Sequence, residues 1–251
     1  MKPKYQTSAQ LKTKARNQLT GKYGGAIVML LIIDAISLMT SFIISLFIPT
    51  GSLAAYLIRL AITFIASTFI GVFQIGVTLY FLKLACGQPV TLQDVAYGFK
   101  NNPEKSLVLS LIMTAISYVF QLSSDIPLEM YLNTMDIGYL FTGFPIMLVV
   151  MVVYIYVSLL VSQVYYLLLD FPNYSAKELF SKSLQLMKGN MWRLFHLEFS
   201  FIPLILLSFL TCGIGLLWLM PYMHMASTNF YLDLMNPAQP DVTGSNVDIQ
   251  V

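Results

Sequence analysis

The chain has 251 residues, of which 57% are apolar and only 10% are charged, and its formal net charge is +2. Soluble domains carry about 25% charged residues, so this chain has too few charges to cover a water-facing surface. The composition therefore excludes an ordinary soluble domain and favours a protein whose apolar surface faces the hydrocarbon of a bilayer.

The first 22 residues are polar and basic and contain no acidic residue. Within them, Leu11, Ala15 and Leu19 recur at the spacing of one helix face. This pattern predicts an interfacial amphipathic helix over residues 8–22 that lies on the membrane surface. Its positive charges suit anionic lipid headgroups.

Long apolar runs follow this segment, and about 20 such residues are enough to cross a bilayer. Two turn-prone sequences, Pro49-Thr50-Gly51 and Cys212-Gly213-Ile214-Gly215, divide the runs into hairpins. The expected fold is one all-α polytopic membrane helix bundle over residues 1–235, with short cytoplasmic interfacial amphipathic helices and a disordered tail at 236–251. The six predicted transmembrane helices cover approximately 24–48, 54–82, 105–122, 143–169, 194–212 and 215–235.

The polar segments between these spans carry local signals of their own. Thr91-Leu92-Gln93-Asp94 and Ser175-Ala176-Lys177-Glu178 have the spacing of capping boxes, so a short helix is expected to start after each. The segment 123–142 has three acidic residues and no Lys or Arg, and it is predicted to be a longer loop.

The basic residues predict the orientation of the chain. They gather in 1–22, 83–105 and 170–193, which therefore face the cytoplasm, whereas the acidic segment 123–142 faces outward. We expect a multi-pass protein of the cell membrane with a cytoplasmic N-terminus. Six spans also place the C-terminus in the cytoplasm, whereas five would place it outside.

A short helix before an apolar hairpin recurs three times along the chain, at intervals of roughly 80–90 residues. The spacing of Leu11, Ala15 and Leu19 matches that of Leu179, Ser183 and Met187. An internal repeat would explain this match and would favour six spans. The alternative is that basic segments before membrane spans look alike by default.

Several stretches carry a resemblance to a known family. They are Ser181 to Phe195, Leu210 to Tyr222, Asn229 to Leu234, the N-terminal helix leading into Gly24-Gly25-Ala26-Ile27, and Leu84-Ala85-Cys86-Gly87. In these stretches the chain resembles a bacterial integral membrane family known as domain-of-unknown-function family 975, over most of residues 8–235. The resemblance implies a six-span membrane protein and supplies no activity.

Strongly polar residues inside the predicted spans are the candidate site, because burying them in hydrocarbon is costly. Asp34, Gln74, Gln163 and His224 could meet near the middle of the membrane. They would then form either a proton- or ion-responsive site or ordinary packing contacts between helices. Arg59, near the outer end of its span, is expected to extend toward the outer headgroups.

No catalytic pattern accompanies these residues. The sequence lacks H-E-x-x-H, a P-loop and G-x-S-x-G, so we expect no enzyme, no metal and no cofactor. The favoured hypothesis is a non-enzymatic protein that acts through protein or lipid partners in the cell envelope. Anionic headgroups would bind the basic segments, and a protein partner or a homo-oligomer is the further option, without nucleic acid. The alternative is a small membrane transporter or channel with a midplane polar site.

Overall fold

The structure is a computed structural model that describes residues 5–48 and 53–237, and these residues form helices without any strand. The expected all-α fold is confirmed for this part of the chain. The turn predicted at Pro49-Thr50-Gly51 and the predicted tail from residue 238 onward lie outside it. In chain order the helices are α1 (Ser8–Leu19), α2 (Tyr23–Phe47), α3 (Leu53–Ala85), η1 (Leu92–Ala96), α4 (Tyr97–Lys100), α5 (Pro103–Thr134), α6 (Gly138–Val161), α7 (Val164–Asp170), α8 (Ala176–Met187), α9 (Met191–Phe199), α10 (Ile202–Leu210) and α11 (Leu216–Met235).

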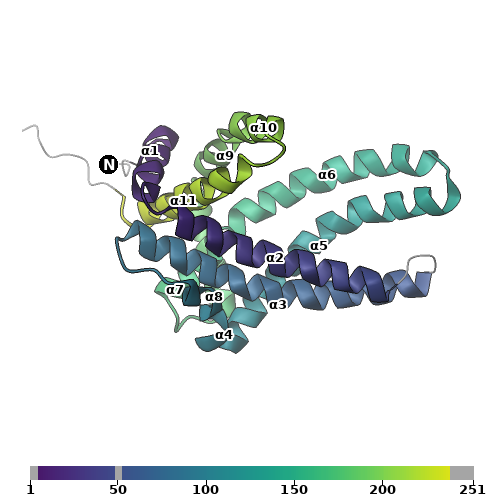
Figure 1. The fold of residues 1–251 in the computed structure, drawn as a ribbon, viewed down its shortest axis with the longest axis horizontal. Coiled ribbons are helices and arrows are strands. Elements are labelled where there is room, and N and C mark those ends of the chain that lie inside the picture. Colours follow the sequence, from purple (N-terminus) through teal and green to yellow (C-terminus); the bar gives the residue numbers. More distant parts are fainter. Residues whose placement is uncertain (1–4, 49–52, 238–251) are drawn as a thin grey trace, which may run out of the picture.

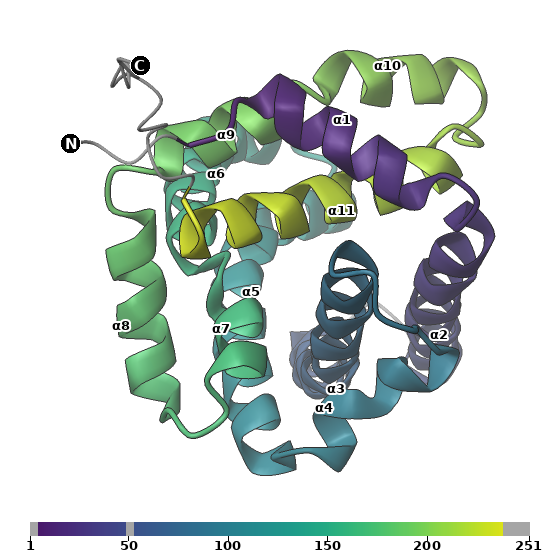
Figure 2. The same ribbon diagram turned by 90° about the vertical axis from the view of Figure 1, so that its left-hand side faces the viewer.

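The long helices lie along the long axis of the molecule, with short helices gathered at one end (Figure 1). Helix α3 packs between α2 and α5, and α5 packs against α6. We call the end that holds α1, α4 and α8 the basal end, and the end where α5 turns into α6 the distal end. Figure 2 shows α1, α8 and α11 lying across the basal ends of the long helices.

The order of short helix and hairpin recurs in the structure. Helix α1 precedes the hairpin α2–α3, η1 and α4 precede α5–α6, and α8 precedes a hairpin made of α9, α10 and α11. The third hairpin is shorter than the others, and its turn does not extend as far toward the distal end (Figure 1).

Five helices in the described part of the chain are long and apolar enough to cross a membrane. They are Tyr23–Phe47, Ala54–Ala85, Pro103–Thr134, Gly138–Asp170 and Met191–Leu210, of which the fourth joins α6 to α7 and the fifth joins α9 to α10. Their surfaces carry large apolar side chains, such as Phe141 and Val149 on α6, which are 71% and 65% exposed. Such a surface suits lipid and would be a liability in water.

Helix α11 is not among these five because polar residues such as His224, Asn229 and Asp233 interrupt its apolar sequence. Much of this helix is nevertheless buried within the protein, as Met225, Phe230 and most of their neighbours are. The prediction of six spans is thus supported for five helices, and the sixth stays a prediction.

The segment 123–142 is not the long loop that its polar residues suggested. Helix α5 continues to Thr134, and α6 begins at Gly138 after a short turn. Pro127 lies inside α5, where a Cβ atom on Gly143 of α6 would approach its ring to 2.4 Å. Asp125 and Glu129 lie instead on one helix face, because they are four residues apart, and only Asp136 lies in the short turn.

Two predicted spans are interrupted. The span 143–169 breaks at Ser162 and Gln163, between α6 and α7. The span 194–212 breaks at Ser200 and Phe201, just before Pro203, whose missing N–H cannot continue the helical hydrogen bonding.

Both predicted capping boxes are formed. The backbone N–H of Thr91 donates to Asp94 at 2.9 Å, and that of Ser175 donates to Glu178 at 2.7 Å. The backbone N–H and hydroxyl of Ser175 hold the pKa of Glu178 below its ordinary value. These boxes begin η1 and α8 at the basal end, where the short helices were expected.

Candidate functional site

The four residues predicted to form a midplane site lie in four different environments. Asp34 lies on an exposed face of α2, Gln74 is half-buried on α3, and Gln163 is buried at the break after α6. His224 of α11 stacks on Phe81, with 5.2 Å between ring centroids and 11° between ring planes. In the described part of the chain, no hydrogen bond or ion pair joins any two of the four, so they form no directly bonded site.

Helix α1 is placed by contacts that its sequence did not reveal. Leu11, Ala15 and Leu19, the apolar face expected to meet lipid, are 2%, 0% and 0% exposed. The helix packs mainly against α11, which comes from the other end of the chain. The apolar face of α1 is therefore covered by protein, and only its polar and basic faces look outward.

A buried ion pair fastens the residues before α1 to the third hairpin. The carboxylate of Asp233 on α11 accepts the backbone N–H of Gln6 at 3.2 Å and the Nη2 of Arg193 on α9 at 2.5 Å. Arg193 also donates to the carbonyl of Gln6 at 3.1 Å and to Asn190 at 3.0 Å, and its guanidinium lies 4.1 Å from the ring centroid of Tyr5. We call Gln6, Arg193 and Asp233 the clamp. It fixes the entry of the chain into α1.

Two further contacts fix α1 along its length. Lys12 donates to the carbonyl and hydroxyl oxygens of Ser200, both at 3.2 Å, just after α9. Gln18 accepts from the amide of Asn229 on α11 at 2.7 Å and donates to the carbonyl of Ala85 at the end of α3 at 3.0 Å. Helix α1 therefore cannot turn its outer face inward without breaking bonds to α3, α9 and α11.

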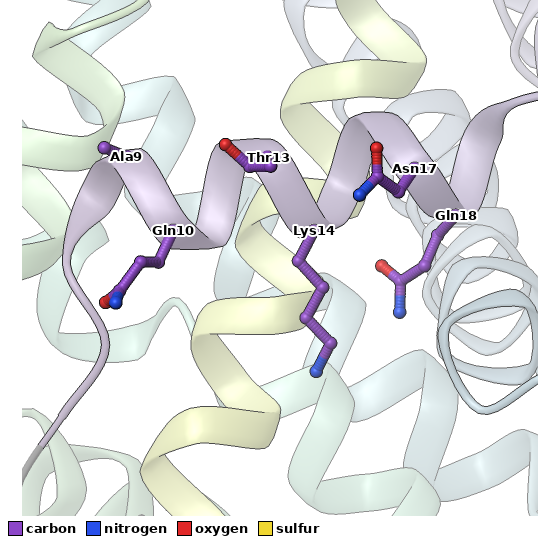
Figure 3. A pocket seen from close by; sticks show the side chains of 6 residues that line it. All are labelled: Ala9, Gln10, Thr13, Lys14, Asn17 and Gln18. Carbon is purple, nitrogen blue, oxygen red and sulfur yellow. The ribbon is translucent and has the colours of Figure 1, made fainter.

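The outer side of α1 carries a shallow hollow of about 620 Å³ (Figure 3). Its lining contains one amine, several amide or hydroxyl groups, and no carboxylate. In Figure 3 the side chains of Gln10, Lys14 and Gln18 extend from the same side of the helix. The lining residues are Ala9, Gln10, Thr13, Lys14, Asn17 and Gln18. A cation flanked by hydrogen-bond donors suits an anionic group.

The charges of the molecule are divided between its two ends. Two ion pairs occur among the described residues, Lys83–Asp94 and Arg193–Asp233, and neither uses an exposed basic residue of the outer basal surface. The exposed basic side chains at this end form what we call the basal cationic surface: Lys14, Arg16, Lys22, Lys100, Lys177 and Lys188. Toward the distal end lie Asp125, Glu129 and Asp136. The base therefore carries an excess of basic side chains beside the exposed Glu104 and Glu178, and acidic side chains outnumber Arg59 toward the distal end.

A protein-family model described as "Protein of unknown function (DUF975)" matches residues 1–238. No curated protein and no solved structure matches the chain.

Proposed function

The chain belongs to the DUF975 family of proteins of unknown function, and we propose that it is a non-enzymatic, multi-pass protein of the cell membrane that binds anionic partners at its basal end. The first partner is the headgroup layer of the cytoplasmic leaflet. The N-terminus lies on this side of the membrane.

The basal cationic surface is the feature that supports binding to anionic headgroups. Its side chains are exposed, and those of α1 project from a helix whose apolar face is already used inside the protein. Basic residues next to membrane spans face the cytoplasm as a rule. Each Lys or Arg close to an anionic leaflet contributes about 1 kcal/mol of attraction, so several together give a clear preference for anionic lipid.

The third hairpin supports the same orientation. It begins at α9 and ends at α11, both of which contact α1 at the basal end. In this proposal the C-terminus shares the cytoplasmic side with the N-terminus, as six spans require. The shorter reach of this hairpin leaves that conclusion unchanged, because a helical hairpin returns to the side from which it starts.

Transport through a midplane site receives less support. That alternative needs Asp34, Gln74 and His224 to line one polar path. His224 stacks on Phe81, and Asp34 lies on an exposed face of α2. These positions favour binding over conduction.

Energy transfer from tryptophan to labelled lipid tests the proposal. The chain has two tryptophans, and Trp192, on α9, is 73% exposed. In a Trp218→Phe background, Trp192 becomes the sole donor in nanodiscs that contain dansyl-phosphatidylglycerol or dansyl-phosphatidylcholine. We expect transfer to favour phosphatidylglycerol and this preference to weaken with added salt. The triple variant Lys14→Gln/Arg16→Gln/Lys22→Gln should reduce the preference by about fivefold or more.

The matched control keeps the charge and changes the side chain. Lys14→Arg/Lys22→Arg should retain the preference for phosphatidylglycerol, because both residues remain cationic. An equal preference in the neutral triple variant and the wild type would contradict the proposal, as would the absence of any preference in the wild type.

A further inference from the structure

A second cavity lies toward the distal end, away from the basal cationic surface. It has a volume of about 550 Å³, is bordered by α2, α3 and α5, and opens to the surface. Its lining is unusually polar for the interior of an apolar helix bundle. Its polar and charged lining residues include Tyr56, Arg59, Thr63, Gln121, Asp125 and Glu129. Charged groups in a space between apolar helices are costly unless a partner or a ligand meets them.

Three charged side chains border this cavity from opposite sides. Asp125 and Glu129 are four residues apart on α5, so they project from the same helix face. Arg59 comes from α3, and no ion pair joins it to either carboxylate among the described residues. Arg59, which the sequence predicts to extend toward the outer headgroups, borders a space that it shares with two carboxylates.

The hydroxyl of Tyr56 adds an unsatisfied group to the same space. Its oxygen is buried and has no hydrogen-bond partner among the described residues. Asp125 and Glu129 line the same cavity as this phenol. A buried hydroxyl without a partner costs about 1–3 kcal/mol of folding free energy. A ligand that forms a hydrogen bond with this hydroxyl would remove that cost.

We propose that this cavity binds a ligand that carries a primary ammonium and an anionic group close together. The carboxylates of Asp125 and Glu129 accept the ammonium protons, and the guanidinium of Arg59 binds the anionic oxygens. The Tyr56 hydroxyl provides a further hydrogen bond. Such a ligand pairs with the charges of both signs in the cavity. A purely anionic or purely cationic ligand would pair with one sign and be repelled by the other.

Two sources supply this chemistry, a free zwitterion or a phosphatidylethanolamine headgroup. The cavity also has an apolar lining, which includes Ile44, Leu128 and Leu132 and could accommodate the start of an acyl chain. The ammonium–anion pair is common to both sources, and the experiment separates them.

Thermal unfolding of the full chain in detergent measures binding. The added probes are phosphatidylethanolamine, phosphatidylcholine and O-phosphoethanolamine, each titrated separately. Phosphatidylethanolamine should raise the unfolding temperature at lower concentration than phosphatidylcholine, whose quaternary ammonium has no proton to donate to the carboxylates. Asp125→Asn/Glu129→Gln should weaken this effect by about tenfold or more, because it removes the charged acceptors of the ammonium. Stabilisation by O-phosphoethanolamine identifies a free zwitterion as sufficient, and stabilisation by the lipid alone identifies the headgroup with its chains.

Two single variants still test ligand binding if the double variant does not fold. Tyr56→Phe should weaken binding several-fold without lowering the unfolding temperature of the ligand-free protein, because it removes a hydroxyl that has no partner. Glu104→Gln, at an exposed carboxylate at the start of α5, should leave binding unchanged. Equal stabilisation of wild type, Tyr56→Phe and Asp125→Asn/Glu129→Gln would overturn the assignment, as would equal responses to both lipids.

Discussion

Gly76→Ala is expected to destabilise the protein by about 3 kcal/mol. A Cβ atom at this position of α3 would lie 2.2 Å from the carbonyl oxygen of Val95 and 2.5 Å from that of Asp94. Both are backbone atoms of η1, so no side-chain rotation relieves the clash. The helix η1 would have to move away from α3 and stretch the Lys83–Asp94 ion pair, which is 2.6 Å long.

The measurement is the unfolding temperature in detergent, which should fall by roughly 6 °C or more. Gly24→Ala is the matched control, because nothing lies within 4 Å of a Cβ atom there and the backbone is helical. Alanine favours a helix over glycine by up to about 1 kcal/mol, so this variant should be neutral or stabilising. Equal losses in the two variants would show that η1 does not approach α3 this closely.

Arg193→Gln is expected to cost about 3–5 kcal/mol, because it leaves the carboxylate of Asp233 buried without its cation. The Asp233 side chain is only 2% exposed, and Arg193 supplies its ion pair. The bond from Arg193 to the carbonyl of Gln6 is lost as well. We therefore expect a lower unfolding temperature and faster tryptic cleavage within α1, because the clamp no longer fixes the chain that precedes it.

A double-mutant cycle separates the ion pair from a general loss of packing. Asp233→Asn alone should cost less than Arg193→Gln, since the remaining guanidinium is partly exposed and can reach solvent. The double variant Arg193→Gln/Asp233→Asn should recover part of the loss of Arg193→Gln, which is the sign of a direct coupling. Lys188→Gln removes an exposed cation from the same region and should change little. If Arg193→Gln lowered the unfolding free energy no more than Lys188→Gln does, the clamp would not stabilise the protein.

The parts of the fold that follow from local chemistry were predictable. Long apolar runs identify α2 and α3 as membrane helices, since bilayer hydrocarbon is the solvent that suits such runs. The boxes at Thr91 and Ser175 identify the starts of η1 and α8, because a side chain three residues away satisfies free amide groups. These signals depend on neighbours in sequence, which are visible without the fold.

The distal part of α5 was mistaken for a loop because polarity alone does not distinguish solvent from an internal cavity. Asp125, Gln121 and Glu129 line a polar space within the bundle, so the helix can continue through them. Their spacing of four residues was the available signal. It becomes informative only once Arg59 is known to lie opposite.

The packing of α1 could not be predicted for a related reason. An apolar stripe such as Leu11, Ala15 and Leu19 suits lipid and protein equally well, and the partner helix α11 lies at the far end of the sequence. The pairing of Arg193 with Asp233 is equally non-local. Asp233 is one of only two acidic residues in the apolar stretch 194–235, and this was the one hint that a cation had to meet it.

The orientation of the molecule is tested by finding the side of the membrane on which each end lies. In a Cys86→Ser/Cys212→Ser background, single cysteines are placed at Met135, which is 72% exposed in the distal turn, and at Lys14 on the basal cationic surface. A membrane-impermeant maleimide is then applied to intact and to permeabilised cells. With the basal end in the cytoplasm, Met135→Cys should be labelled in intact cells and Lys14→Cys should be labelled only after permeabilisation. Labelling of Lys14→Cys in intact cells, with Met135→Cys protected, would contradict this orientation.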